Sequence, residues 1–406
     1  MPRYNGGFLG TDGLDAPDPP TAVTPTADIL SVSVAFTAPT DTGTSAITGF
    51  VAQVSTDGTD YSAGSNTGTS SPIVVSGLTA GAAATAKVWA INAYGTSAPS
   101  EASASFTPTA APRGLFGGGT DGSAYLDTID YVTISSTGNA TDFGDLTVGR
   151  ESISSGSSET RGVFAGGYEG TSVGTRDTVD YVTIASTGDG TDFGDLSSRS
   201  SNGAGASNST RLLIALGTFA SSLDTIDYFT ISSTGDATDF GNLTQARYNL
   251  AAVSSSTRAA FGAGNTGSAQ VNTIDYVTIG STGNASDFGD LTQAGDRAAS
   301  CSSSTRGLWA GRIYGSTRYN IIDYITIAST GNATDFGDLT VARQHFGGTS
   351  SATRGVFGGG QSDSISAEDT IDYVTIASTG NASDFGNLSQ GRRALAACSS
   401  DHGGLQ

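Results

Sequence analysis

A stretch close to IDYVTIASTGNATDFGDLT occurs six times between Asp130 and Ser389, and this repetition limits the possible folds more than any other feature of the chain. Each unit opens with an arginine, and consecutive opening arginines are 47 to 50 residues apart. These residues are Arg113, Arg161, Arg211, Arg258, Arg306 and Arg354. Units of this size cannot bury their own hydrophobic faces, so they are expected to pack against one another as a solenoid or a propeller.

Length varies in only one segment of the unit. The aspartate of IDY always precedes the aspartate of DFG by 12 residues, and the next opening arginine always follows 19 residues later. From the opening arginine to the IDY aspartate the distance ranges from 16 to 19 residues. A loop tolerates such changes, whereas one extra residue in a paired strand turns its buried face outward. The variable segment is therefore predicted to be a loop.

Each unit has the pattern of four β-strands. Residues 161–167 (RGVFAGG) are apolar and end on glycines, residues 177–184 (DTVDYVTI) alternate as a half-buried strand does, and residues 191–196 (TDFGDL) follow a turn. Segments of small residues such as 247–257 (RYNLAAVSSST) suit the innermost strand, where neighbouring units crowd an axis. Six such units predict a six-bladed β-propeller.

The ends of the repeat region indicate how the propeller closes. The first unit begins at Arg113 without an innermost strand, and the chain finishes with a surplus one at residues 392–401 (RRALAACSSD). Pairing of this C-terminal strand with the strand opened by Arg113 removes the exposed sheet edges. We therefore expect the C-terminal strand to complete the first sheet.

The units resemble kelch repeats over residues 113–406. The shared order is an apolar strand, two glycines, a variable loop, an aromatic DY strand, and a last strand that ends before an arginine. The arginines of that last position are taken to be Arg150, Arg199, Arg247, Arg343 and Arg392. Where kelch units carry a tryptophan late in the blade, this chain has phenylalanine. The resemblance implies a kelch-like propeller spanning residues 109–406.

The N-terminal part has a different composition and resembles a fibronectin type III domain at residues 16–108, which implies an immunoglobulin-like sandwich. Alternating strands are predicted at residues 31–39 and 47–58, with more proline and alanine than in the repeats. Phe36 stands where that family has an early core tryptophan, and Ala84 where it has a corner tyrosine. Residues 1–15 are predicted to be an extended arm, and residues 106–112 a linker. The fold class is thus all-β.

Charge and composition exclude several classes of partner. The formal net charge is -20, Lys87 is the sole lysine, and such a surface repels nucleic acid and anionic membranes. The first residues lack the features of a signal peptide, and no apolar run is long enough to span a membrane, so synthesis in a cytoplasm is expected. Cys301 and Cys398 occupy similar places in two units, so we predict no disulfide framework.

The repeated acidic residues are interpreted as structural. A DFG triplet holds a metal in protein kinases, but a catalytic residue is needed once and here the triplet occurs six times. The IDY aspartates are expected to accept hydrogen bonds from backbone amides or from the repeated arginines, because a buried carboxylate must be paired. They are Asp130, Asp180, Asp227, Asp275, Asp323 and Asp372.

Catalysis and metal binding are not predicted. The chain has only two histidines, His345 and His402, and neither adjoins a nucleophile motif. Turn residues such as Asn332, Asp335 and Asp338 offer oxygen ligands for Ca²⁺, but the spacing of a calcium loop is absent. We therefore expect no enzyme activity, no cofactor and no metal, and the calcium alternative stays open.

Binding is the function that the variable loops favour. All of them join the same two strands of their units, so they are expected on one face, and they carry aromatic and arginine side chains suited to recognising sugars or proteins. The candidate binding residues are Tyr125, Tyr168, Arg176, Arg312, Tyr314, Arg318 and Tyr319.

The repeat unit and the domain order also resemble proteins of tailed bacteriophages, particularly those of marine cyanobacteria. The resemblance implies a virion protein made in the host cytoplasm: a tail fibre or other host-contacting appendage that binds a cell-surface glycan or protein. The N-terminal arm and the fibronectin-like domain would contact other virion proteins, and homo-oligomers are compatible with this role. The alternatives are a non-adhesive capsid or tail decoration and a secreted glycan-processing enzyme.

Overall fold

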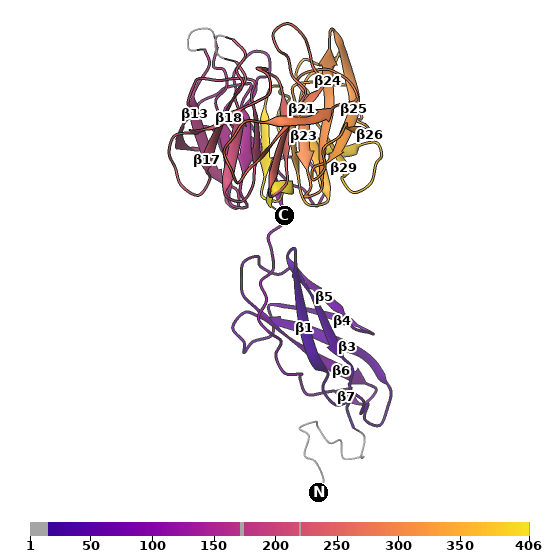
Figure 1. Cartoon of the computed structure of the whole chain (residues 1–406). Helices are drawn as coiled ribbons and strands as arrows, with labels where there is room; N and C mark the ends of the chain where they lie inside the picture. The colour runs from indigo at the N-terminus through magenta and orange to yellow at the C-terminus, as the bar shows by residue number, and fades with distance from the viewer. Residues whose placement is uncertain (1–14, 171–173, 219–220, 406) are drawn as a thin grey trace. The chain divides into compact units, whose positions relative to one another are not determined.

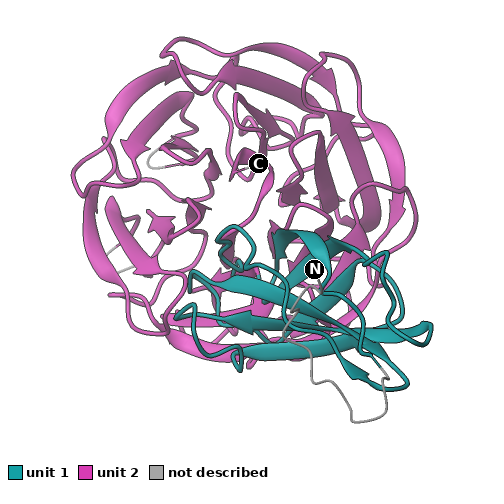
Figure 2. Ribbon diagram, turned by 90° about the horizontal axis from the view of Figure 1, so that it is seen from below, with its two compact units in different colours: residues 1–111 teal, residues 112–406 magenta. Residues whose placement is uncertain are grey.

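The computed structural model describes residues 15–170, 174–218 and 221–405, and its regular structure is almost entirely β-strand (Figure 1). The chain divides into two compact units, residues 1–111 and residues 112–406 (Figure 2). Most of the predicted N-terminal arm lies outside the described residues. Within them, no helix has the length and apolar character that crossing a membrane requires.

Unit 1 consists of two antiparallel sheets, with strand orders β1-β2-β5 and β4-β3-β6-β7. The strands are β1 (Thr21–Asp28), β2 (Ser31–Thr37), β3 (Ile47–Ser55), β4 (Gly64–Gly68), β5 (Ile73–Ser76), β6 (Thr85–Asn92) and β7 (Gly95–Thr96). Alternate residues of β2, β3 and β6 are buried in one core shared by both sheets, as the period-2 pattern predicts.

The two altered positions of unit 1 are both buried. Phe36 packs against Phe50 with ring centroids 4.8 Å apart in the core of unit 1. The backbone of Ala84 exchanges two hydrogen bonds with that of Phe106, at 2.8 and 2.9 Å. Because the Phe106 side chain belongs to the core, the prediction of a linker from residue 106 is wrong at its first residue.

Unit 2 contains six four-stranded antiparallel sheets, here called sheets 1 to 6. From the innermost to the outermost strand, the orders are β31-β8-β9-β10 in sheet 1, β11 to β14 in sheet 2, β15 to β18 in sheet 3, β19 to β22 in sheet 4, β23 to β26 in sheet 5 and β27 to β30 in sheet 6. Figure 2 shows the sheets arranged around a common centre, so the architecture is propeller-like.

The strand bounds repeat closely from sheet to sheet. The innermost strands are β31 (Ala396–Ser399), β11 (Ser154–Ser157), β15 (Ala204–Ser207), β19 (Ala251–Ser254), β23 (Ala299–Ser302) and β27 (Gly347–Ser350). The second strands are β8 (Arg113–Gly117), β12 (Arg161–Ala165), β16 (Arg211–Ala215), β20 (Arg258–Gly262), β24 (Arg306–Tyr314) and β28 (Arg354–Gly358).

The third strands carry the IDY motif. They are β9 (Thr128–Thr133), β13 (Thr178–Thr183), β17 (Thr225–Thr230), β21 (Thr273–Thr278), β25 (Thr317–Thr326) and β29 (Thr370–Thr375). The outermost strands are β10 (Thr141–Asp145), β14 (Thr191–Asp195), β18 (Thr238–Asn242), β22 (Ser286–Asp290), β26 (Thr334–Asp338) and β30 (Ser383–Asn387). A 3-10 helix, η1 (Gly403–Leu405), follows β31.

The C-terminal strand pairs with the first strand of the repeat region, as predicted. In the β31–β8 ladder Ala396 lies opposite Gly117 and Ser399 opposite Gly114. The two cysteines occupy equivalent places on innermost strands, Cys301 opposite Leu308 and Cys398 opposite Leu115, and both are buried and free. Sheet 1 is therefore built from both ends of unit 2.

Glycine in the DFG triplet allows neighbouring sheets to approach closely. Gly144 has φ = 144°, and a Cβ atom there would lie 2.5 Å from the carbonyl oxygen of Gly188 in sheet 2. Gly188 lies in a turn of sheet 2, and its amide donates to the carbonyl of Phe143 in sheet 1 at 2.8 Å. The same contact joins sheet 6 to sheet 1, where the Gly138 amide donates to Phe385. The DFG triplet is thus a packing element between sheets.

The opening arginines form a second set of contacts between sheets. Arg161 lies over the ring of Tyr181 in its own sheet and donates to the carbonyl of Ile231 in the next. Arg354 of sheet 6 donates in the same way to Ile134 of sheet 1. Each opening arginine therefore combines a cation–π contact with a hydrogen bond to the adjacent sheet.

The IDY aspartates are fully buried, and five of them pair with an arginine. Asp180 accepts hydrogen bonds from the backbone and hydroxyl of Thr147 and from Arg150 of the preceding sheet. The five ion pairs are Arg150–Asp180, Arg247–Asp275, Arg312–Asp323, Arg343–Asp372 and Arg392–Asp130. The expectation that these aspartates accept hydrogen bonds from backbone amides or from arginines is confirmed at all six positions, and five of them have an arginine partner.

Sheet 3 departs from this arrangement. Ser200 occupies the place of the pairing arginine, because Arg199 is offset by one residue, half exposed and 3.9 Å from Asp177. Asp227 accepts only from the backbone and hydroxyl of Ser197 and has no arginine partner among the described residues. Burial raises its pKa. The prediction that Arg199 stands at the same repeat position as Arg150, Arg247, Arg343 and Arg392 is therefore wrong.

Candidate binding face

The variable segments lie at one end of unit 2, where the second strand of each sheet leaves toward the third. We call this end the loop face; its described segments are 118–127, 166–170, 174–177, 216–218, 221–224, 263–272, 311–320 and 359–369. The strands are antiparallel, so Arg113 at the start of β8 lies at the opposite end, together with the C-terminal residues (Figure 1). The candidate residues are therefore carried on one face of a rigid scaffold.

Tyr125 and Tyr168 come together across sheets 1 and 2. Their rings meet edge to face with centroids 5.8 Å apart, and Tyr125 is 39% exposed. The Tyr168 backbone exchanges two hydrogen bonds with that of Glu151, which fixes the loop. These two predicted residues form an aromatic pair on the surface.

Arg176 is engaged within its own loop. Its guanidinium pairs with the carboxylate of Glu169, and both side chains are about one quarter to one third exposed, at 31% and 26%. Each of its two bonded nitrogens donates to the same oxygen, Oε2 of Glu169. Most of its charge is therefore already matched.

Arg312 is not a surface residue, and its prediction as a binding residue was wrong. It lies on β24, is fully buried, and its Nη2 atom donates to Asp323 at 2.7 Å. The supposed loop of sheet 5 is a hairpin in which β24 and β25 continue to Tyr314 and Thr317. Gly295 stands where four other sheets have the pairing arginine, and its Cβ position would be 2.9 Å from Cδ of Arg312. Arg312 fills that space.

Tyr314 lies at the tip of this hairpin and lines a groove between sheets 4 and 5. It is 48% exposed, and the opposite wall contains Tyr248, Asn265 and Gln270. The Gln270 side chain spans the two sheets: its Oε1 atom accepts from the Gly315 amide at 2.7 Å, and its Nε2 atom donates to the Ile313 carbonyl at 3.0 Å. Sequence reasoning found Tyr314 and missed the other three residues.

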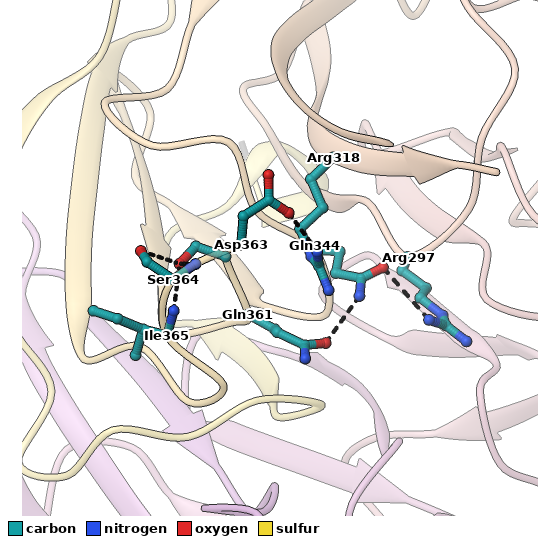
Figure 3. A network of polar contacts seen from close by, with 8 residues as sticks. Arg297, Arg318, Gln344, Gln361, Asp363, Ser364 and Ile365 are labelled. Carbon is teal, nitrogen blue, oxygen red and sulfur yellow. Dashed lines mark hydrogen bonds and ion pairs between the residues drawn. The ribbon is translucent and has the colours of Figure 1, made fainter. Parts of the chain in front are cut away.

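Arg318 and Tyr319 are strand residues of the same hairpin. The Arg318 side chain is 17% exposed and pairs with Asp363 of sheet 6, as Figure 3 shows. Beside this pair, Gln344 donates to Gln361 at 2.9 Å and accepts from Arg297 at 3.4 Å. Tyr319 is half-buried opposite Arg312. The structure thus distributes the predicted residues around the face instead of gathering them at one place.

At the centre of the loop face, six residues close a ring of backbone hydrogen bonds. Each amide donates to the carbonyl of the equivalent residue in the preceding sheet, at 2.7 to 3.0 Å, and each residue has a left-handed φ between 56° and 63°. The ring consists of Ala394, Ser152, Asn202, Asn249, Arg297 and His345. Such φ values cost energy for residues other than glycine, so the ring is a strained and specific arrangement.

The ring surrounds an axial pocket with a volume of about 140 Å³. Asn202, Asn249, Arg297 and His345 line it together with Ser152. The residues of this ring stand at one position of the repeat, two after the pairing-arginine position, yet differ in chemistry. Aligning the repeats by that position was the signal available in the sequence.

Two polar atoms beside the pocket are buried without a hydrogen-bond partner among the described residues: Nε of Arg297 and Nε2 of His345. Burial, and then the positive charges of Arg297 and Arg393, lower the pKa of His345 to about 3, so its imidazole is neutral at pH 7. None of the described lining residues is acidic. Among the described lining residues, Arg297 alone carries a charged side chain at pH 7.

The far end of the axis is filled by the C-terminal residues. Nε2 of His402 lies 3.1 Å from the hydroxyl of Ser207 and 3.2 Å from the carbonyl of Ser157, while its Nδ1 atom accepts from the Gly404 amide. Burial lowers the pKa of His402 to about 4. Access to the axial pocket is therefore from the loop face.

The described residues contain no group of three metal-ligating side chains. Asn332, a candidate calcium ligand, instead accepts the Asp290 amide of the preceding sheet at 3.1 Å through its side-chain oxygen. Comparison of the sequence with protein-family models and with curated proteins finds no match.

Proposed function

We propose that this chain is a bacteriophage virion protein, a tail fibre or similar host-contacting appendage, that binds a cell-surface glycan or protein through its loop face. In this proposal unit 2 is a closed, six-bladed, kelch-like β-propeller, and unit 1 is a fibronectin type III-like domain that contacts other virion proteins together with the N-terminal arm. The propeller presents the binding face and requires no enzyme activity, cofactor or metal.

The observation that carries the proposal is the groove between Tyr248 and Tyr314. Two aromatic rings flank side-chain amides of Asn265 and Gln270, on segments that belong to different sheets. Aromatic faces suit the apolar faces of sugars, and the side-chain NH₂ of Asn265 can donate to a hydroxyl group. Gln270 already bonds across the two sheets, and its role is to hold the two walls of the groove together. Recognition of a neutral saccharide is therefore favoured at this place.

Closure of the propeller is supported by the repeated contacts between sheets. The hydrogen bonds of the DFG turn, of the opening arginine and of the loop-face ring recur between sheet 6 and sheet 1 in the same form as between the other sheets. Among the described strands, a closed ring leaves unpaired only the short edges of the six outermost ones, which suits a protein that must stay soluble outside a cell.

A non-adhesive decoration protein is the second candidate, and one observation favours it. The charges of Arg176, Arg312 and Arg318 are each matched by a carboxylate of the same chain, which leaves less of the predicted surface to contact a partner. The two candidates make different predictions for loss of the groove.

Two experiments test the proposal. Mass spectrometry of purified particles should detect the chain, and its absence would exclude both virion roles. The variants Tyr314→Ala and Tyr248→Ala should reduce adsorption of particles to host cells, while mass spectrometry should show the same amount of the chain in variant and wild-type particles. Unchanged adsorption in both groove variants would favour decoration.

A further inference from the structure

We propose that the axial pocket of the loop face is a binding site for a compact oxyanion, namely a carboxylate, sulfate or phosphate group carried on a saccharide. This inference depends on the pocket inside the ring of Ser152, Asn202, Asn249, Arg297, His345 and Ala394. It does not need the chain to be a virion protein, and it concerns a different place from the groove at Tyr314.

The charge distribution is the first argument. A chain with a net charge of -20 repels small anions over most of its surface. The axial pocket is an exception, because its described lining holds a guanidinium and an imidazole and no carboxylate. Two carboxylates directly precede ring residues in sequence, those of Asp296 and Glu151. Asp296 is 2% exposed and accepts from Asn249 and Gln270, and Glu151 lies near the positive charge of Arg393.

The hydrogen-bonding capacity is the second argument. Buried polar atoms are nearly always paired, so the partnerless Nε of Arg297 calls for an acceptor, and Nε2 of His345 donates to the same acceptor in the tautomer that carries its proton there. The side-chain oxygen of Gln344 accepts a hydrogen bond from Nη1 of Arg297 at 3.4 Å, and this contact orients the guanidinium (Figure 3). An oxyanion can accept from an arginine and a neighbouring imidazole at once, which a neutral hydroxyl does less strongly.

The size of the pocket is the third argument. Its volume of about 140 Å³ is several times the roughly 30 Å³ that one water occupies in the liquid, so a group of several heavy atoms fits. The wall also offers the hydroxyls of Ser152 and Ser154 and the side-chain amides of Asn202 and Asn249. These neutral groups suit the ring hydroxyls of a sugar that carries the anion.

The test measures binding of small probes to the full chain by calorimetry and by NMR, with glucuronate, glucose and inorganic phosphate. Glucuronate is expected to bind with a dissociation constant of about 1 mM or below and glucose at least about tenfold more weakly, a difference of about 1.4 kcal/mol. Phosphate binding as tight as glucuronate binding would support an oxyanion site in which the sugar ring contributes nothing.

The decisive variant is Arg297→Asn. Two other positions of the ring, Asn202 and Asn249, already carry asparagine with the same left-handed φ, so this change removes the charge and keeps the backbone. We expect it to weaken glucuronate binding at least about tenfold. His345→Asn should have a smaller effect in the same direction. Arg199→Gln is the control, because Arg199 is half exposed and outside the pocket.

Three results would overturn the inference. They are failure of both anions to bind the wild-type chain at roughly 50 mM, equal binding of glucose and glucuronate, and unchanged affinity in an Arg297→Asn variant whose melting temperature matches that of the wild type. If Arg297→Asn unfolds, the His345→Asn variant decides the question by the same measurement. Loss of adsorption at Tyr314 with intact glucuronate binding would separate this site from the groove.

Discussion

Arg312 donates to Asp323 at 2.7 Å, and the residue of sheet 4 at the position equivalent to Arg312 is Gly264. In sheet 4 the ion pair is made by Arg247, whose equivalent beside sheet 5 is Gly295. A Cβ atom at Gly264 would lie 3.2 Å from Cδ of Arg247, and one at Gly295 would lie 2.9 Å from Cδ of Arg312. The arginine and the glycine have therefore exchanged positions while the guanidinium stays in the same space.

This exchange predicts a large interaction energy between two substitutions. Arg312→Gly alone leaves the Asp323 carboxylate buried without its cation, which should destabilise the chain by about 3–5 kcal/mol. Gly295→Arg alone should also destabilise it, because two arginines then compete for one site. The double variant should recover to within about 1 kcal/mol of the wild type in urea unfolding. Additive losses in the double variant would contradict the exchange.

Because Asp227 lacks an arginine partner within the described part of the chain, its replacement by asparagine should cost less stability than the same replacement at Asp275. Asp275→Asn leaves Arg247 buried without its carboxylate and should cost about 3–5 kcal/mol. Asp227→Asn removes a charge that has no arginine beside it among the described residues and should cost about 1 kcal/mol or less. Urea unfolding of the two variants at pH 7 is the measurement, and equal losses would contradict the missing pair.

The pH dependence of the Asp227 variant has a defined sign. Burial raises the pKa of Asp227, so the folded state holds this proton more tightly than the unfolded state does. Stability from the protonated form is present below the unfolded pKa of about 4 and is lost as the pH rises through the folded pKa. Asp227→Asn should therefore compare more favourably with the wild type at pH 7 than at pH 4.

The repeat arithmetic predicted the order of the four strands in each sheet and the pairing of the C-terminal strand with β8, because constant spacing marks paired strands and variable spacing marks loops. It failed at Arg312, where equal length concealed a hairpin in place of a loop. It also missed the axial ring, since the repeat defines a position such as residue 297 or 345 but not its left-handed φ. The groove could not be predicted either, because it depends on contacts between sheets, such as that of Gln270 with Gly315, and the repeat spacing does not specify these contacts.

His402 predicts a loss of stability on mild acidification. Burial disfavours the charged imidazole in the folded state and lowers the pKa of His402 to about 4. The Nδ1 atom accepts from the Gly404 amide, as only an unprotonated nitrogen can. The unfolded state takes up the proton near pH 6.5, so stability is full above that pH and decreases as the pH falls toward 4. Between pH 7 and pH 5 this residue should contribute a loss of about 2 kcal/mol.

The measurement is urea unfolding of the wild type and of His402→Asn at both pH values. The variant should show a smaller decrease, although part will persist because His345 also has a lowered pKa, about 3. Arg297→Asn provides a check on that second histidine, since it removes a neighbouring positive charge and should reduce the shift at His345. An identical pH dependence in wild type and His402→Asn would show that the C-terminal residues do not hold the neutral imidazole.

The last prediction concerns removal of residues 392–406, which eliminates β31 and Arg392. Sheet 1 then loses its innermost strand, and Asp130 loses the guanidinium that pairs with it at 3.0 Å. The hydroxyl of Ser399, which donates to the carbonyl of Ser350 in sheet 6, is also lost. Because sheets 6 and 1 no longer contact through this strand, unfolding of unit 2 should lose its cooperativity and its denaturant dependence should become shallower.

Removal of residues 402–406 alone is the matched control, since it keeps β31 and Arg392 and takes away only η1 and His402. Fluorescence of Trp309, buried in sheet 5, reports on unit 2 when Trp89 of unit 1 is replaced by phenylalanine. The control should unfold in one transition with a midpoint near that of the wild type at pH 7. The longer deletion should lose about 3–5 kcal/mol from the unpaired Asp130 alone. A longer deletion that melts like the control would show that the C-terminal strand does not hold sheet 1 together.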